Sequence, residues 1–312
     1  MRYVYTLALP IFFVLFAVAS VRAAEPPVDS MQKTYSSPTD AFKALIEGME
    51  KNNDELLLDV LGHDQKDLVV QSDKESSTQM REKFSKMARE RLKIEMSGEK
   101  AVGCFGYRCW PFPIPLVKTG DNWKFDTNAG KEEILNRRIG RNELKAIEFV
   151  EVFGDAQRAY FSVDRTGDKV QKYAQKLVSE KDKKDGLYWP LTNAPRQDLS
   201  PLAGFFEDGQ DFLDGNGSNI AYHGYYFKVL TQQGTNAPNG KYNYVINGNM
   251  IAGFALVGWP ADYGASGIMT FMVSHQGTIY QKDLGADTEK LAPALTEYDP
   301  DSTWKELKSD NK

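Results

Sequence analysis

A long amphipathic segment followed by a series of short β-prone runs constrains the fold of this 312-residue chain more than any other feature. Between residues 142 and 163, apolar side chains recur at every third or fourth position and form one stripe along a helix. The stripe consists of Leu144, Ile147, Val150, Phe153, Ala156, Tyr160 and Val163. From residue 222 onward, short runs rich in Tyr, Phe, Val, Ile and Thr alternate with turn residues, which predicts an antiparallel sheet. We therefore expect the helix to bury its stripe on one sheet face, in a helix-plus-sheet domain spanning 142–285.

A separate block at residues 36–130 precedes this domain. Ser37 and Pro38 are residue types preferred at the N-cap and first position of a helix, and a second helix is predicted at 78–93. Short strands are predicted near 99–106, 112–118 and 122–126. Helices that precede an antiparallel sheet indicate an α+β fold. The block is similar to the cone-shaped fold of nuclear-transport-factor-two-like domains, in which a helix pair packs into a curled sheet.

The remaining segments are predicted to connect or flank these two domains. Residues 131–141 are rich in charge at helical spacing, so we expect a solvated connecting helix, with an anion site as the less favoured alternative. Residues 24–35 are predicted to form a flexible N-terminal segment, and residues 286–312 a polar C-terminal tail.

The first residues predict a secretory signal peptide at 1–23. Arg2 precedes an apolar run from Tyr3 to Val21, and the tripeptide VRA that ends at Ala23 matches a small-x-small cleavage site. We expect cleavage near Ala23 and Ala24, and a periplasmic or secreted protein; retention of the run as a membrane anchor is the alternative. No later run is long enough to span a membrane.

The charge of the chain after the leader is acidic. Loss of Arg2 and Arg22 leaves 36 basic against 43 acidic residues, without a long basic run. Such a chain lacks the electrostatic footprint of nucleic-acid binding, so we expect no nucleic-acid partner. Envelope or secreted proteins, or glycans, are the expected partners.

Both cysteines, Cys104 and Cys109, lie in the stretch GCFGYRCW. In an exported protein, this close pair predicts a local disulfide, whose short loop limits its stabilising effect. The stretch offers fewer ligands than a zinc site requires and has no CxxC motif, which indicates a structural role.

Five long stretches resemble the bacterial family catalogued as domain of unknown function 2950. They are GKEEILNRRIGRNEL (130–144), DAQRAYFSVD (155–164), DGLYWP (185–190), YHGYYFKVLTQQG (222–234) and GFALVGWPADYGASGIMTFMVSHQGTIYQKDLG (253–285). The resemblance implies an exported bacterial protein and assigns no catalytic residues. The long helix with AQRAY, followed by GYYFKV and the segment around YGASG, also resembles the globular head of type IV pilins and pseudopilins. Because the pilin processing motif is missing, this second resemblance implies a pilin-like head on a soluble protein.

His223 is the residue that most invites a catalytic interpretation. Side-chain alternation in a strand would place it beside Tyr225 and Phe227, and no Ser or Cys nucleophile with an identifiable base accompanies it. We therefore predict a packing or recognition role. The predicted ligand-binding residues are His223, Tyr225, Trp189, Trp259 and Tyr263. Partial core positions are the alternative for these aromatic residues.

Residues 207–219, EDGQDFLDGNGSN, form the candidate metal site. Their hard oxygen ligands suit Ca²⁺, and some pseudopilins hold calcium in a comparable loop. The predicted ligands are Asp208, Asp211, Asp214, Asn216 and Asn219. The spacing departs from that of an EF-hand, and the same residue types also fill ordinary turns.

These features together predict a non-catalytic exported binding protein with two α+β domains. One alternative is a periplasmic hydrolase that uses His223 and the acidic 207–219 loop. The other alternative is a structural subunit of an extracellular assembly, which the pilin resemblance suggests.

Overall fold

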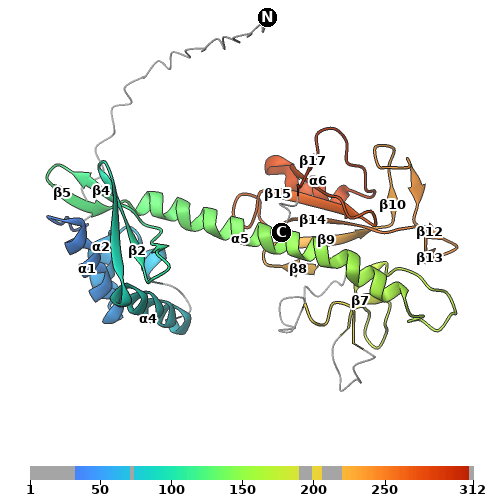
Figure 1. Ribbon diagram of the computed structural model, residues 1–312, viewed down its shortest axis with the longest axis horizontal. Helices are drawn as coiled ribbons and strands as arrows, with labels where there is room; N and C mark the ends of the chain where they lie inside the picture. The colour runs from blue at the N-terminus through green and yellow to red at the C-terminus, as the bar shows by residue number, and fades with distance from the viewer. Residues whose placement is uncertain (1–31, 71–73, 190–198, 206–219, 309–312) are drawn as a thin grey trace, which may run out of the picture. The chain divides into compact units, whose positions relative to one another are not determined.

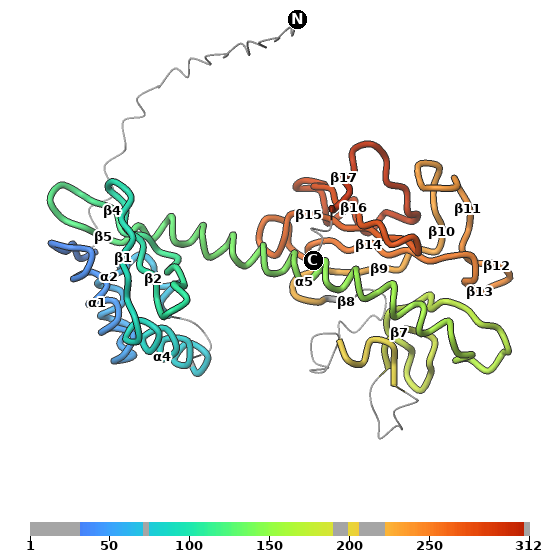
Figure 2. Tube along the Cα trace, in the orientation of Figure 1, coloured from blue at the N-terminus to red at the C-terminus, as the bar shows by residue number. Residues whose placement is uncertain are grey.

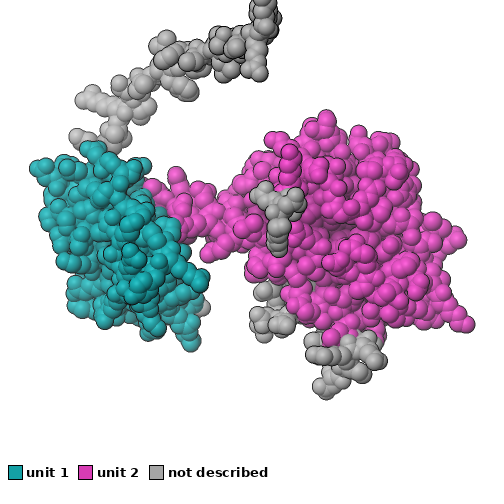
Figure 3. Space-filling model, in the orientation of Figure 1, with its two compact units in different colours: residues 1–127 teal, residues 128–312 magenta. Residues whose placement is uncertain are grey.

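The computed structural model describes residues 32–70, 74–189, 199–205 and 220–308. The chain divides into two compact units, residues 1–127 and 128–312, which Figure 3 colours separately. Both units combine helices with antiparallel sheets, which confirms the predicted α+β class. The predicted signal peptide and its cleavage site lie outside the described residues. Within the described ranges, no helix is long and apolar enough to cross a membrane.

Unit 1 begins with helices that pack on one face of its sheet. The helices are α1 (Pro38–Glu50), α2 (Asp54–Leu61), α3 (Lys66–Val69) and α4 (Lys74–Glu90). Helix α1 begins as the sequence predicts, because the Ser37 side chain accepts a hydrogen bond from the Asp40 amide (3.2 Å) and Pro38 occupies the first turn. The second predicted helix ends at Glu90, three residues earlier than expected, because Leu92 already pairs with Phe105 in the sheet.

The sheet of unit 1 has the strand order β1-β2-β4-β5, with β3 paired to β2 (Figure 1). Its strands are β1 (Leu92–Ser97), β2 (Lys100–Phe105), β3 (Trp110–Pro111), β4 (Leu116–Thr119) and β5 (Asn122–Phe125). Gly103 lets helix α1 approach this sheet, because a Cβ at that position would lie 2.6 Å from the Phe42 ring. Phe42 in turn contacts the ring of Phe125 edge-on, at a centroid distance of 5.3 Å, in the centre of the core.

Helix α5 (Thr127–Phe161) is one continuous helix of 35 residues. The stretch predicted as a connecting helix at 131–141 is therefore helical, but the predicted boundary at 142 is wrong, because the same helix runs through it. The connector contains no proline, its Gly140 costs only about 1 kcal/mol, and the Glu133–Arg137 pair (2.7 Å) supports the helix at i,i+4. The centre of the predicted stripe is buried, whereas its two ends, Leu144 and Val163, are 68% and 51% exposed.

The main sheet of unit 2 contains six antiparallel strands in the order β17-β16-β15-β14-β9-β8. They are β8 (Ile220–Tyr222), β9 (Tyr225–Leu230), β14 (Ala255–Pro260), β15 (Met269–Ser274), β16 (Ile279–Asp283) and β17 (Lys305–Glu306). Helix α5 covers one face, where the rings of Phe149 and Phe227 lie 4.3 Å apart. Helix α6 (Thr288–Ala294) lies on the other face, where Lys228 Nζ donates to the Pro293 carbonyl (2.6 Å). The predicted packing of the long helix on a sheet is thus present.

Shorter elements complete unit 2, and Figure 2 traces the chain through them. Strands β6 (Lys176–Val178) and β7 (Gly186–Tyr188) form a parallel pair. Two antiparallel pairs follow: β10 (Gln232–Gln233) with β11 (Tyr242–Asn243), and β12 (Val245–Ile246) with β13 (Asn249–Met250). The 3₁₀ turn η2 (Gly285–Asp287) precedes helix α6. The polar tail predicted at 286–312 instead contributes α6, β17 and core side chains. Tyr298 and Trp304 are only 1% and 9% exposed, so this segment packs on unit 2.

Candidate functional site

His223 lies in the two-residue turn that joins β8 to β9, where Tyr222 pairs with Tyr225. Its φ is +45° and that of Gly224 is +74°, and positive φ at both central residues is the signature of a type I′ hairpin turn. The His223 side chain is exposed and its ring lies edge-on to Tyr222, with centroids 4.3 Å apart. The prediction that His223 shares a strand side with Tyr225 and Phe227 is therefore wrong, because the turn takes it out of the strand.

This geometry predicts how substitutions of His223 affect stability. Asparagine is preferred at this turn position, so we expect His223→Asn to leave the free energy of unfolding unchanged or slightly raised. Valine is β-branched and resists positive φ, so His223→Val is expected to cost about 1–2 kcal/mol. Urea denaturation of both variants tests the assignment; equal stability of the two variants would contradict it.

Two of the predicted ligand-binding residues lie near the turn at His223. Tyr225 is fully buried and its hydroxyl donates to the Met269 carbonyl (3.0 Å), while burial and the Glu143 carboxylate raise the pKa of this phenol. Tyr263 belongs to the loop formed by residues 261–268 and pairs with Gly267, whose backbone packs on Tyr225. The phenol of Tyr225 therefore serves as a neutral internal donor.

Of the other two predicted ligand-binding residues, Trp259 lies on β14 at the same end of the sheet but on its opposite face, and Trp189 follows β7. Trp259 is 3% exposed, and its ring is tilted by 47° against that of Tyr226, its partner on β9, at a centroid distance of 6.0 Å. The side chain of Tyr226 points away from the face that Tyr225 occupies. Trp189 is 7% exposed, with the Arg165 guanidinium 5.4 Å and the Lys184 ammonium 5.8 Å from its ring. The structure does not bring the five predicted residues together into one patch.

The 261–268 loop is attached to helix α5 by polar side chains. Arg138 Nε donates to the Ala265 carbonyl (3.1 Å), Asn142 Nδ2 donates to the Ser266 carbonyl (2.8 Å), and Glu143 Oε1 accepts from the amides of Ile268 (2.9 Å) and Met269 (3.0 Å). Ser266 itself lies in a turn, where its Oγ accepts from the Asp262 amide (2.9 Å). These hydrogen bonds fix the loop on the helix. The polar residues around His223 therefore have a structural role.

The two remaining predictions concern metal and sulfur. The proposed calcium ligands Asp208, Asp211, Asp214, Asn216 and Asn219 lie outside the described residues. Cys104 and Cys109 form a disulfide, as predicted.

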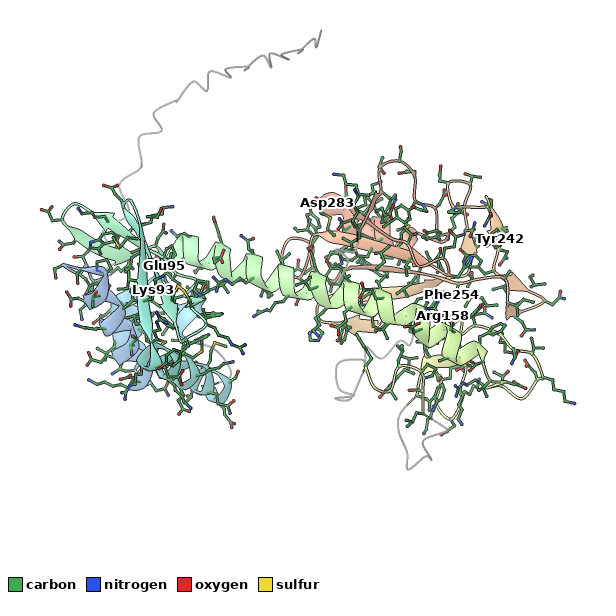
Figure 4. The ribbon with its side chains drawn as sticks, in the orientation of Figure 1. Lys93, Glu95, Arg158, Tyr242, Phe254 and Asp283 are labelled. Atoms are coloured by element: carbon green, nitrogen blue, oxygen red, sulfur yellow. A yellow bond between two sulfur atoms is a disulfide. The ribbon has the colours of Figure 1, made fainter. Side chains whose placement is uncertain are left out.

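The described part of unit 2 contains a groove of about 490 Å³ between helix α5 and strands β15–β17, which we call the α5 groove. Its floor is apolar and is formed by Val150, Val273, Ile279 and Leu307. Its rim is charged and is formed by Glu151, Arg158 and Glu306. Arg158, labelled on α5 in Figure 4, pairs with Asp155 one turn away (2.6 Å). An apolar floor with a few polar groups at the rim is the usual composition of a ligand site.

Local sequence features keep the α5 groove open. At Gly154 on helix α5, a Cβ would meet only the Arg158 guanidinium, at 3.5 Å, so the missing side chain leaves space above the floor. Gly277, with φ of +85°, closes the turn between β15 and β16. The amide of Leu307 donates to the Ile279 carbonyl (2.9 Å) and thereby holds the C-terminal segment at the rim.

The α5 groove was not predicted from the sequence, because it joins segments far apart in the chain. Arg158 comes from the motif at 155–164, Val273 and Ile279 come from the motif at 253–285, and Glu306 comes from the presumed tail. One local signal was present. Gly154 lies four residues after Val150, where the apolar stripe of the helix would otherwise continue, and a glycine there leaves a gap in that face.

Comparison with known proteins supplies a family and no activity. The family model described as protein of unknown function (DUF2950) matches residues 32–307, which confirms the resemblance seen in the five motifs. No curated protein and no solved structure matches the chain, so the similarity to pilin heads stays a prediction.

Proposed function

We propose that this chain, which belongs to the DUF2950 family of proteins of unknown function, is an exported binding protein that holds its partner in the α5 groove of unit 2. The observation that carries the proposal is the groove itself, with its apolar floor and charged rim; Arg158, Val273 and Ile279 of its lining belong to two of the family motifs. The polar residues around His223 support binding over catalysis, because they fix a loop on helix α5. The apolar leader supports export.

The expected partner is a segment of an envelope or secreted protein, or of a glycan, that covers apolar surface and meets both signs of charge at the rim. Glu151 and Glu306 carry negative charge, whereas the exposed Arg158–Asp155 pair contributes little net field. Binding that depends on a few buried apolar contacts should be abolished when the floor is covered.

A glycine substitution tests the α5 groove. Gly154→Leu places a side chain over the floor, and we expect retention of the native partner to fall at least about tenfold, the effect of losing roughly 1.4 kcal/mol. The measurement is quantitative mass spectrometry of proteins that crosslink to the chain in its native envelope.

A second glycine of the same helix provides the matched control. A Cβ at Gly140 meets nothing within 4 Å, and both substitutions raise helix propensity by roughly 0.5–1 kcal/mol, so neither variant should unfold. Gly140→Leu is expected to retain the partner fully. Equal retention by the two variants would remove the groove as the binding site.

The architecture of unit 2 supports a second candidate function. A long helix packed along an antiparallel sheet is the arrangement of a pilin head, which favours a structural subunit of an extracellular assembly. Light scattering of the purified protein separates the two candidates: a concentration-dependent rise in mass favours the subunit, and a constant mass favours the binding protein.

A further inference from the structure

Unit 1 contains a cluster of potential metal ligands that the α5 groove does not involve. The carboxylate of Glu95 and the sulfur atoms of Cys104 and Cys109 all lie within 4.8 Å of one another, and Glu95 Oε1 is 3.9 Å from Cys109 Sγ. The sequence around the cysteines offers two ligands, and the third comes from a neighbouring strand. Because Lys93 pairs with Cys104 in the β1–β2 register, Lys93, Glu95 and Cys104 share one face of the sheet.

The turn that carries the two cysteines has backbone contacts of its own. The Gly106 amide donates to the Arg91 carbonyl (2.8 Å), and the Cys109 amide donates to the Gly106 carbonyl (3.1 Å). Cys104 also pairs with Pro111 across β2 and β3. These contacts do not involve sulfur, so we expect them to keep the two cysteines and Glu95 close together when the disulfide is reduced.

We propose that this cluster is a thiol-gated zinc site, which is closed when Cys104 and Cys109 form the disulfide and binds one Zn²⁺ when they are reduced. A dithiol reductant would supply two electrons and two protons, becoming a disulfide itself and leaving two cysteine thiols. Zinc would then bind both sulfurs as thiolates, with release of two protons, and Glu95 as the third ligand. Two thiolates and a carboxylate form a donor set that suits zinc, with water in the fourth position.

The ion pair between Lys93 and Glu95 is weak enough for zinc to replace the lysine at the Glu95 carboxylate. Lys93 Nζ lies 2.7 Å from Glu95 Oε1, and Figure 4 shows the two side chains next to each other. Both side chains are more than half exposed, at 56% and 52%, so the ion pair is weak and can yield the carboxylate to a divalent cation. Lys93→Ala should therefore strengthen zinc binding, because it removes a competing cation.

Titration of the full-length protein with zinc chloride, before and after reduction, tests the proposal. We expect one zinc ion per chain only after reduction, and no such binding by the Cys104→Ser, Cys109→Ser double variant. Cobalt(II) bound at the same site should show the near-ultraviolet absorption of thiolate-to-metal charge transfer. A reduced protein that binds no more zinc than the oxidised protein would overturn the proposal.

The Glu95→Gln variant distinguishes zinc bound at the folded three-ligand site from zinc bound adventitiously by the two thiols alone. Loss of this ligand should weaken zinc binding at least about tenfold, while the exposed Glu99→Gln, at the β1–β2 turn, leaves it unchanged. If reduction merely unfolds unit 1, Glu95 is no longer next to the thiols and Glu95→Gln has no effect. An unchanged affinity in Glu95→Gln therefore contradicts the proposal whatever the state of the fold.

Discussion

Replacement of Gln157 by leucine is expected to destabilise unit 2 by about 2–5 kcal/mol, because it leaves two buried backbone groups without partners. Gln157 lies on helix α5 and is fully buried. Its Nε2 donates to the Ala174 carbonyl (2.8 Å), and its Oε1 accepts from the Ala174 amide (2.8 Å). Leucine has a similar volume and fills the space, but its side chain can neither donate nor accept.

Two measurements test this prediction. The first is the free energy of unfolding in urea, and the second is the rate of amide hydrogen exchange in β14 and β15. Gln276→Leu is the control, since Gln276 is exposed and such surface changes usually fall within about 0.5 kcal/mol. Equal losses in the two variants would show that the paired hydrogen bonds of Gln157 do not stabilise the unit.

Gly267→Ala is expected to destabilise unit 2 by about 1–3 kcal/mol through overpacking. A Cβ at this position would lie 2.2 Å from the hydroxyl oxygen of Tyr225, and that ring is fully buried. The phenol also donates to the Met269 carbonyl, so it cannot move aside without losing a hydrogen bond.

Tyr225→Phe provides the second half of a double-mutant cycle with Gly267→Ala. Removal of the hydroxyl removes the shortest contact, so the alanine should cost less in the phenylalanine background than in the natural one. Gly204→Ala, where a Cβ meets nothing within 4 Å, is the control for a glycine replacement without a clash. Identical costs in both backgrounds would show that the Tyr225 hydroxyl does not contribute to the clash.

The family motifs account for structure more than for chemistry. In the motif at 222–234, Gln233 is 1% exposed, and its Nε2 donates to the carbonyls of Pro238 (2.6 Å) and Gly240 (2.7 Å). Its Oε1 accepts from the Tyr244 hydroxyl (2.9 Å). Such saturated buried amides fix one loop conformation, in the same way that Gln157 fixes the segment at Ala174.

Periodicity in the sequence was enough to predict the pairing of a helix with a sheet. The stripe residues Val150, Phe153 and Tyr160 are buried as a period near 3.6 requires, because that pattern is a property of adjacent residues. The turn at His223 was missed for a local reason. A histidine before glycine adopts positive φ less often than asparagine, so the residues YHGY do not stand out as a hairpin turn.

The candidate sites could not be predicted because each joins residues through tertiary contacts. Glu95 approaches Cys109 only through the register of β1 and β2, and Glu306 reaches the α5 groove only because β17 pairs with β16. A single sequence carries weak information about such register, since the same alternation of apolar residues fits several strand pairings. The charged stretch at 131–141 was predicted as a connecting helix separate from the one that follows, but a change from charged to amphipathic pattern does not end a helix, and α5 continues through residue 142.

Amide hydrogen exchange of the full-length protein, with and without the partner recovered by crosslinking in its native cells, tests the proposed binding site most directly. We expect slower exchange around the α5 groove, in the β15–β16 turn at Gly277 and in the segment that carries Leu307. The amides of the turn at His223 and of the 261–268 loop should exchange at the same rate in both samples. Protection confined to that turn and loop, with the groove unchanged, would contradict the proposed site.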